Sequence, residues 1–570
     1  MNARRASGSA MILIGLAGAL AQGCGSPDAT SSVAPVSSSS PLLSVGSSTA
    51  LDAGGTVALS GGDTGGEFVL VVADTAVDGT SAASSFQIAA TGVSIAGAVS
   101  APSTSRSPAS GDATAVSPRL DFAYAAQLNE RAHRELLPRV SGARRAYQQA
   151  STSPRGASFS RLTAALQVGD LVTLNVASRA CDSLINRASR VVAIGTKSIV
   201  VADTLNPAGG FSTADYQKFA ARFDTLVYPV DVDNFGAPAD FGIEGKILLF
   251  FTKAVNELTP RGSTSYVGGF FFDRDLFPIT STPDLQGCPG SNVGELFYLL
   301  TPDPTGSVNG NIRRTGFVDS VTTAVLAHEF QHLINASRRI YVNKSTKPFE
   351  VVWLNEGLSH IAEELLFYRE GGSGPQLNLD VNAIRARVAL KNAFNADQSA
   401  NAQRYRLYLE APSTNSPIRN DDSLGTRGAT WDFLRYAADR KLRSGGSDAS
   451  VWFALVNSQA NGLANLRQVF GANLGGMLRD WSVSHYTDDV VPGVSSDFMQ
   501  PSWNWHSLYA ALASTGGYPL ATSGLPAAGT SGSTVPGGAN FYRFSVAAKA
   551  SASIKLTAPQ PIGGVIVRIR

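Results

Sequence analysis

The chain has 570 residues, more than a single hydrophobic core usually serves, and its net charge is only +2. Charged residues make up 16% of it, without the basic stripe that binds nucleic acid or an acidic interaction tail. Hydrophobic residues make up 44%, enough for a large core. We therefore expect one large unit with smaller flanking modules, and no nucleic-acid partner.

The first residues have the pattern of an export signal. Two arginines precede an apolar stretch from Ala10 to Ala21, which is too short to span a membrane and ends in small residues. Leu-Ala-Gln-Gly-Cys at 20–24 resembles a bacterial lipobox, although Ala21 stands where such boxes usually carry Leu. We expect a signal peptide at 1–24 and an exported lipoprotein, at the outer membrane or cell surface, whose only membrane contact is lipid on Cys24. The alternative is an ordinary cleaved signal peptide and a secreted protein.

Two cysteines remain once Cys24 is set aside. Exported proteins form disulfides, so Cys181 and Cys288 are candidates for a single bond. The sequence does not give the distance between their Cα atoms, so two separate buried thiols are the alternative.

Changes in composition mark the segments that follow. Residues 25–50 are rich in Ser, Pro, Ala and Gly and are expected to be a linker. Strand-like runs separated by glycines indicate a small all-β module at 51–99. A linker and a helical segment, the helix at about 125–149, are expected within 100–166.

A larger unit is expected over 167–510. Apolar runs predict its first strands, at Leu171–Val176, Val191–Ile194 and Lys246–Phe251, and a helix at Asp215–Phe223. Strands and helices mix over 167–317, and helices dominate 318–510, so the fold class is α+β. Short strands return in a C-terminal β segment at 515–570.

The strongest motif is His-Glu-Phe-Gln-His at 328–332, in a segment expected to be helical. Residues four apart share one helix face, so His328 and His332 project together at a separation that suits one Zn²⁺. Glu329 lies about 100° round the helix, where it can reach a water on the metal without binding the metal. Zinc lowers the pKa of bound water to about 7 while a carboxylate takes its proton, which makes Glu329 the candidate general base. The alternative is an amphipathic helix whose histidines are satisfied by neighbours.

A catalytic zinc needs a third protein ligand and one open position. Glu356 is the candidate ligand, because it lies 24 residues after His332 in a second expected helix, Trp353–Leu365. The gap leaves room to end the first helix, cross a loop and return toward the metal.

The two motifs are similar to those of the gluzincins, in which a later Asn-Glu helix completes a His-Glu-x-x-His zinc site. His-Glu-Phe-Gln-His-Leu-Ile-Asn and Trp-Leu-Asn-Glu-Gly-Leu-Ser most resemble the hyicolysin family of bacterial neutral metalloproteases. The likeness extends over about 167–487, with softer matches at 268–272, 291–298 and 428–436.

This resemblance implies a secreted zinc endopeptidase that cleaves protein or peptide substrates. It implies a two-lobed, thermolysin-like gluzincin unit, with an α/β lobe at 167–317 and a helical lobe at 318–510, flanked by the small all-β modules. A substrate would lie extended along an edge strand, for which Gly268–Phe272 is the candidate.

The chain departs from the thermolysin-like pattern just after the third ligand. Those enzymes place Ser and then an Asp that orients a zinc histidine, whereas this chain has Ser359 and His360. Glu363, one turn after Ser359, is the candidate replacement, and a solvated surface glutamate is the alternative. His360 is either a hydrogen-bond donor behind the ligands or a packed histidine. The group that stabilises the oxyanion stays open among Tyr405, Tyr408, Arg427, His485 and Tyr486.

Two further hypotheses concern metals and function. Asp231–Gly236 hints at a Ca²⁺ loop, but Phe235 occupies an EF-hand ligand position, so Ca²⁺ is possible without a clear motif. The main alternative to a protease is a non-catalytic surface adhesin that keeps zinc for stability, which the β modules and Ser-rich tether suit. Glu329 argues against it, because a structural zinc has no use for that carboxylate. A zinc amidase acting on cell-wall peptides is a third hypothesis.

Overall fold

The computed structural model describes residues 42–79, 82–96, 119–120, 123–152, 166–241, 245–263, 265–512 and 517–570. The expected signal peptide, Cys24 and much of both expected linkers lie outside these ranges. The described residues form a mixed α/β structure. Within them, no helix is both long and apolar enough to cross a membrane.

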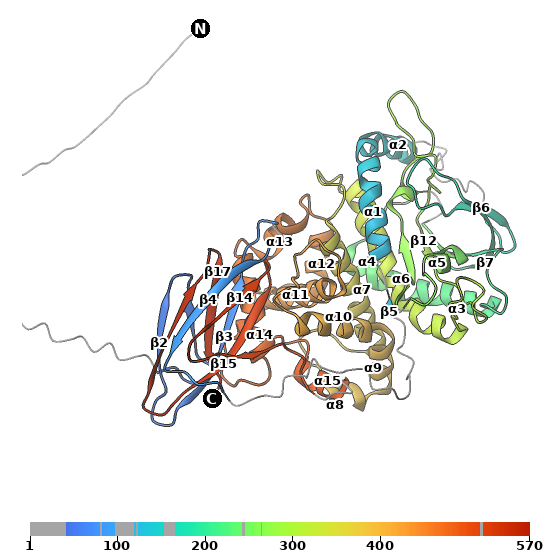
Figure 1. Ribbon diagram of the computed structural model, residues 1–570. Coiled ribbons are helices and arrows are strands. Elements are labelled where there is room, and N and C mark those ends of the chain that lie inside the picture. The colour runs from blue at the N-terminus through green and yellow to red at the C-terminus, as the bar shows by residue number, and fades with distance from the viewer. Residues whose placement is uncertain are drawn as a thin grey trace, which may run out of the picture. The chain divides into compact units, whose positions relative to one another are not determined.

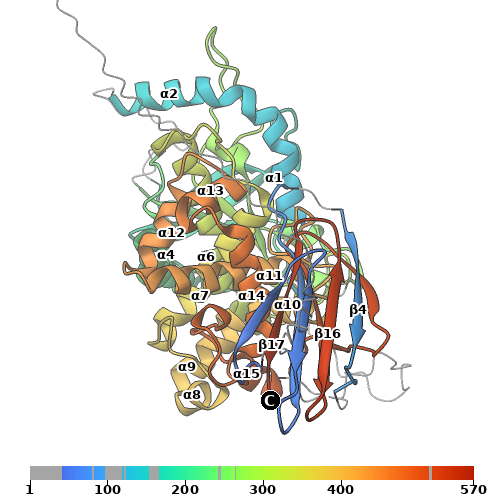
Figure 2. The same ribbon diagram turned by 90° about the vertical axis from the view of Figure 1, so that its left-hand side faces the viewer.

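Strands from the two ends of the chain pair with each other, so blue and red strands alternate in Figure 1. One sheet has the order β1-β17-β3-β15-β13, and the other has the order β14-β4-β16-β2. Figure 2 shows β4 and β16 together in one layer and β17 in the other. The strands are β1 (Ser48–Leu51), β2 (Thr56–Ser60), β3 (Gly66–Asp74), β4 (Ser84–Thr91), β13 (Ser523–Gly524), β14 (Thr530–Thr534), β15 (Ala539–Val546), β16 (Ser551–Thr557) and β17 (Ile562–Arg568).

The segments 51–99 and 515–570, expected as two separate modules, thus form one β sandwich. Neither segment has enough strands for two packed layers, and β3 completes its sheet only by pairing with β15 and β17.

The central strand β3 also attaches the sandwich to the helices. Side chains alternate between the two faces of a strand, yet every residue from Phe68 to Asp74 is buried. Leu70 and Val72 face the second sheet, whereas Val69 and Val71 join the core shared with the helical part. The helix packed on β3 is α14 (Leu474–Thr487).

A six-stranded sheet has the order β11-β12-β9-β8-β7-β6. β8, β9 and β12 run parallel, and the outer strands are antiparallel to their neighbours. The predicted strands fall in β6, β7 and β9, and β11 lies at the edge, as expected for Gly268–Phe272. The bounds are β6 (Leu171–Asn175), β7 (Asn186–Ile194), β8 (Ser198–Asp203), β9 (Ile247–Phe251), β11 (Gly269–Phe271) and β12 (Leu296–Leu299), with a separate parallel pair of β5 (Arg119–Leu120) and β10 (Ser265–Tyr266).

Helices make up most of the chain beyond residue 314, as expected. α7 packs against α6 and α11, and α10 packs against α11. The main helices are α6 (Thr315–Ser337), α7 (Val352–Gly371), α8 (Val381–Ala386), α9 (Val388–Ala393), α10 (Ser399–Glu410), α11 (Leu424–Leu442), α12 (Asp448–Val456), α13 (Gly462–Phe470) and α15 (Trp505–Leu512). Short helical turns are η1 (Leu137–Arg139), η2 (Phe223–Val227), η3 (Asp273–Leu276), η4 (Arg338–Val342), η5 (Phe394–Gln398) and η6 (Ser496–Phe498).

Five helices lie earlier in the part of the chain that the structure describes. The expected helical segment is α1 (Ala123–Leu136) and α2 (Val140–Thr152), the predicted helix after residue 212 is α3 (Thr213–Arg222), and α5 spans Lys253–Glu257. The hinted Ca²⁺ loop is instead the helix α4 (Tyr228–Phe235), whose side chains project outward around an axis instead of converging on one ion.

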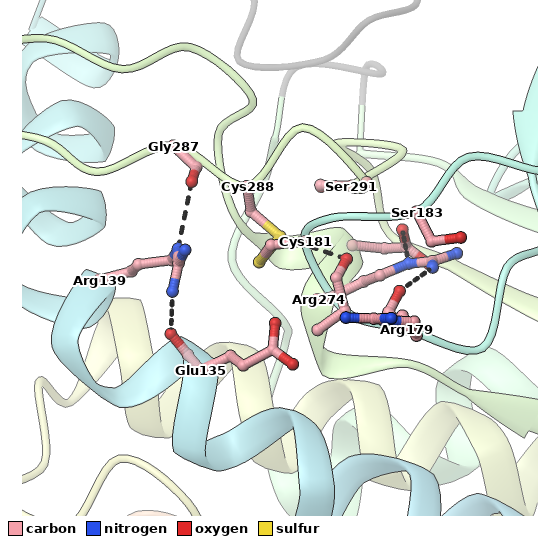
Figure 3. Close-up of a disulfide and its surroundings, with 12 residues drawn as sticks. Glu135, Arg139, Arg179, Cys181, Ser183, Arg274, Gly287, Cys288 and Ser291 are labelled. Atoms are coloured by element: carbon pink, nitrogen blue, oxygen red, sulfur yellow. Dashed lines mark hydrogen bonds and ion pairs between the residues drawn. A yellow bond between two sulfur atoms is a disulfide. The ribbon is translucent and has the colours of Figure 1, made fainter.

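Cys181 and Cys288 form a disulfide, and their Cα atoms are 4.5 Å apart (Figure 3). The bond joins the loop after β6 to the loop before β12. Arg274 holds the first loop as well, because its guanidinium donates to the carbonyls of Asn175 and Arg179 at 2.8 and 2.9 Å. The alternative of two separate thiols is therefore wrong.

Replacing both cysteines with serine is expected to lower the free energy of unfolding by about 2–5 kcal/mol, because the bond closes a long loop in the unfolded chain. The bond spans 107 residues. Denaturant unfolding of oxidised wild type, reduced wild type and the double variant measures the effect. The last two should agree with each other, and equal stability of all three would contradict the prediction.

Candidate metal centre

Two packed helices bring the predicted site residues together. α6 carries His328, Glu329 and His332, and α7 carries Glu356, and all four side chains are buried. Gly357 lets α7 approach α11, because a Cβ there would lie 2.5 Å from Thr430 Cγ2. The close approach of these helices sets which side chains can reach Glu356.

Donor atoms of three residues face one another between the helices. The Nε2 atoms of His328 and His332 are 3.2 Å apart. Glu356 places Oε2 3.5 Å from Nε2 of His328 and Oε1 3.7 Å from Nε2 of His332. These three residues form a group that could hold a metal ion.

The spacing of the donors fits a tetrahedral ion. Zinc bonds of about 2.0–2.1 Å in a tetrahedral site put neighbouring donor atoms about 3.3–3.4 Å apart. The observed separations of 3.2, 3.5 and 3.7 Å bracket that value. Two imidazole nitrogens and one carboxylate are also a donor set that zinc accepts in catalytic sites.

The remaining nitrogen of each histidine has a partner on α7. Nδ1 of His328 lies 2.8 Å from Glu363 Oε1. Nδ1 of His332 lies 3.0 Å from Ser359 Oγ, whose own proton goes to Gln331 at 2.7 Å. Both partners can accept an Nδ1 proton, and in that tautomer the Nε2 lone pairs would be available to a metal ion.

Glu363 is buried and not a solvated surface residue. His360 Nδ1 also lies 3.0 Å from Glu363 Oε1, so His328, His360 and Glu363 form a second group that could hold a metal. That group would use Nδ1 of His328, whereas Nε2 serves the first group. His360 itself is fully buried, and burial lowers its pKa to about 3.

An arginine supports each of the two glutamates. Arg427 from α11 donates to Glu356 Oε2, and Arg404 from α10 donates to Glu363 Oε2 at 3.2 Å. Gly428 makes this possible, because a Cβ there would lie 2.2 Å from the Arg404 carbonyl carbon. Arg404 has no sequence signal, since it lies on another helix with no fixed spacing to either motif.

Charge in the metal-free cluster is unevenly shared. Burial lowers the pKa of His332 to about 4. Burial also opposes the charged form of His328, but hydrogen bonds to Glu356 and Glu363 outweigh it and raise the pKa to about 9. Burial favours the neutral form of Glu356, but Arg427 and the two histidines outweigh it and hold the pKa of Glu356 below its usual range. The cluster therefore stabilises one positive charge, which a metal ion would replace.

Glu329 stands beside the cluster without joining it. The backbone N–H of Phe271 in β11 donates to Glu329 Oε2 at 2.8 Å. No donor among the described residues reaches Oε1. Burial raises the pKa of Glu329 to about 7, and the charge of Glu356 adds to the effect. A carboxylate so placed can exchange a proton near neutral pH.

The edge strand expected to take a peptide is partly occupied. The Phe271 N–H already donates to Glu329, and the Phe271 carbonyl accepts a hydrogen bond from Asn129 Nδ2 of α1 at 3.0 Å. Asn129 Oδ1 accepts from the N–H of Asp273 at 3.0 Å. A peptide that pairs with β11 would therefore use the backbone groups before Phe271.

Of the five oxyanion candidates, Arg427 contacts Glu356 directly. Tyr405 Oη lies 2.9 Å from Nδ1 of His485, and Tyr408 stacks on Trp481, within the helical core. Arg427 is thus the candidate with a hydrogen bond to a residue of the donor cluster.

Over 265 residues the chain is 28% identical to the neutral metalloprotease ShpI of Staphylococcus hyicus. The matched stretch covers 45% of this chain and 57% of the relative, so the chain spans a little more than half of that protein's length. No family model matches the chain. The similarity makes the chain a distant relative of a metalloprotease.

Arg427→Ala is expected to lower the free energy of unfolding of the metal-free protein by about 3–5 kcal/mol, because it removes the cation from two carboxylates in a buried site. Those carboxylates are Glu356 and Asp422. Denaturant titration measures the change. Arg419→Ala is the control, since its pair with Asp421 is about one-third exposed and should contribute at most about 1 kcal/mol. Equal effects of the two variants would contradict the prediction.

Proposed function

We propose that the chain is a zinc-dependent endopeptidase. The observation that carries the proposal is the spacing of the two Nε2 atoms and the Glu356 oxygens, which suits one tetrahedral ion. The distant relationship to a neutral metalloprotease supports a protease over other zinc hydrolases. His328, His332 and Glu356 would be the protein ligands.

When bound, zinc supplies a Lewis acid that polarises the peptide carbonyl and activates the attacking water. Glu329 would take the proton of that water on Oε1, while the Phe271 N–H holds Oε2 in place. Glu329 would then return the proton to the leaving amine. Glu363 and Ser359 would keep the ligand histidines oriented, and Glu363 would act with Arg404 behind it.

The proposal extends to architecture and location. We propose a two-lobed gluzincin unit over 167–510, in which the six-stranded sheet and the helices from α6 onward form the lobes. Export, lipid attachment at Cys24 and anchoring at the cell surface are proposed from the sequence of residues 10–24 alone. A protein or peptide is the proposed substrate.

A non-catalytic zinc adhesin is the second candidate. The β sandwich built from both chain ends favours it, since such modules suit cell surfaces. The position of Glu329 favours the enzyme. Within the described part of the chain no donor reaches Oε1 of this buried carboxylate, and a role as the catalytic base would account for keeping so costly a group there.

Glu329→Gln separates the two candidates. The variant keeps all three ligands, so zinc stoichiometry and thermal stability should stay near wild type. Casein hydrolysis should fall by at least about 10²-fold, because the amide cannot act as a base. Unchanged hydrolysis would overturn the mechanism. A wild-type protein that binds zinc yet cleaves no protein would favour the adhesin.

A further inference from the structure

The catalytic base of the proposed enzyme depends on a single backbone group. Glu329 is fully buried, and the N–H of Phe271 donates to its Oε2 at 2.8 Å. In the described part of the chain, no other hydrogen-bond donor reaches either oxygen of this carboxylate. The direction in which Oε1 points therefore depends on where one peptide group lies.

The neighbouring strand β12 does not hold that peptide group. Phe271 is the last residue of β11, and it lies opposite Phe297 of β12. Successive residues of a strand direct their backbone groups toward opposite sides. Those of Phe271 point away from β12, because the N–H donates to Glu329 and the carbonyl accepts from Asn129. Another element has to fix this end of the edge strand.

Asn129 of α1 makes the contact that β12 does not make. Its Nδ2 donates to the Phe271 carbonyl and its Oδ1 accepts from the Asp273 N–H, each at 3.0 Å. A residue of an adjacent strand forms this same pair of bonds, to the carbonyl of one residue and the N–H two residues later. The Asn129 amide thus takes the place of a strand partner over the length of one residue.

The helix that carries Asn129 is itself anchored. Leu128 and Leu136 of α1 lie in the main hydrophobic core. His133, one turn after Asn129, places Nε2 2.5 Å from Oδ2 of Asp273. α1 therefore contacts the end of β11 at two points one helical turn apart, from a fixed position.

We propose that Asn129 is a positioning residue for the catalytic base, because it holds the Phe271 peptide that directs Glu329 toward the attacking water. The inference rests on the proposed endopeptidase function. Asn129 acts through Phe271 and touches no reacting atom. Its hydrogen bonds go to the backbone of residues 271 and 273 and not to a proposed zinc ligand, so its replacement should leave zinc binding intact.

The test compares Asn129→Ala and the isosteric Asn129→Asp with wild type, each full length and zinc-loaded, on one peptide that wild type cleaves. The aspartate opens no cavity, but it sets a carboxylate oxygen against the Phe271 carbonyl where the amide donated. Each variant should lower kcat at least about 10-fold and keep KM within about twofold, because a misplaced base slows the reaction without weakening substrate binding. Zinc content and thermal unfolding verify that each variant is folded.

Hydrogen exchange gives a readout that does not need activity. Loss of the Asn129 bonds should increase deuterium uptake, measured by mass spectrometry, in fragments that cover residues 269–273. Uptake elsewhere in the six-stranded sheet should stay at the wild-type level.

Asn256→Ala is the matched control. Asn256 on α5 also holds a strand end with its side-chain amide, because Nδ2 donates to the Thr301 carbonyl at 2.8 Å and Oδ1 accepts from the Thr301 N–H at 3.2 Å. Thr301 lies just beyond β12, and within the described residues neither of the two hydrogen-bonds to Glu329 or to a proposed ligand. The control should keep the wild-type kcat, whatever its loss of thermal stability.

A double-mutant cycle separates positioning of the base from general loosening of the site. Glu329→Gln removes the base, so adding Asn129→Ala should change the residual kcat by less than about twofold. In the presence of Glu329, the same substitution should have its full effect. A purely structural role of Asn129 would lower both rates equally.

Three results would overturn the inference: wild-type kcat in a folded Asn129 variant, an equal loss of rate in the Glu329→Gln background, or unchanged hydrogen exchange at 269–273. Each would leave the proposed function standing. A zinc-loaded wild type that cleaves no peptide would instead overturn the proposed function, and the role of Asn129 with it.

Discussion

Two buried glutamates on one face of α7 hold the candidate centre together. Glu356 and Glu363 are two helical turns apart, so both face the histidines of α6. Glu356 lies on the Nε2 side of the two histidines, and Glu363 contacts Nδ1 of His328. Buried carboxylates are costly unless they are paired, and α11 and α10 each supply an arginine for one of them. The packing of four helices thus supports one small charge network.

Local spacing predicts which side chains lie together between the two helices. The i, i+4 rule places His328 and His332 on one face, and the following helix makes Glu356 the natural third donor. Glu363 also follows from helical periodicity, and the structure places it on His328. Arg404 could not be predicted, because it reaches Glu363 from 41 residues away on another helix. That contact depends on how closely α10 packs on α11, and Gly428 allows the two helices to approach.

The β structure shows the same limit. Individual strands at both chain ends are visible as alternating apolar runs, but their pairing joins β3 to β15 and β17 across more than 400 residues. Periodicity gives a strand's existence and not its partner. The edge position of β11 was predictable, whereas its contact with Asn129 depends on where α1 packs.

The proposed function depends on His328, His332 and Glu356 holding one zinc ion. Anomalous diffraction at the zinc edge, on crystals grown with zinc, tests it most directly. We expect one strong peak about 2.0–2.2 Å from both Nε2 atoms and from a Glu356 oxygen. A peak between His328 Nδ1, His360 and Glu363, or no peak between the two helices, would contradict it.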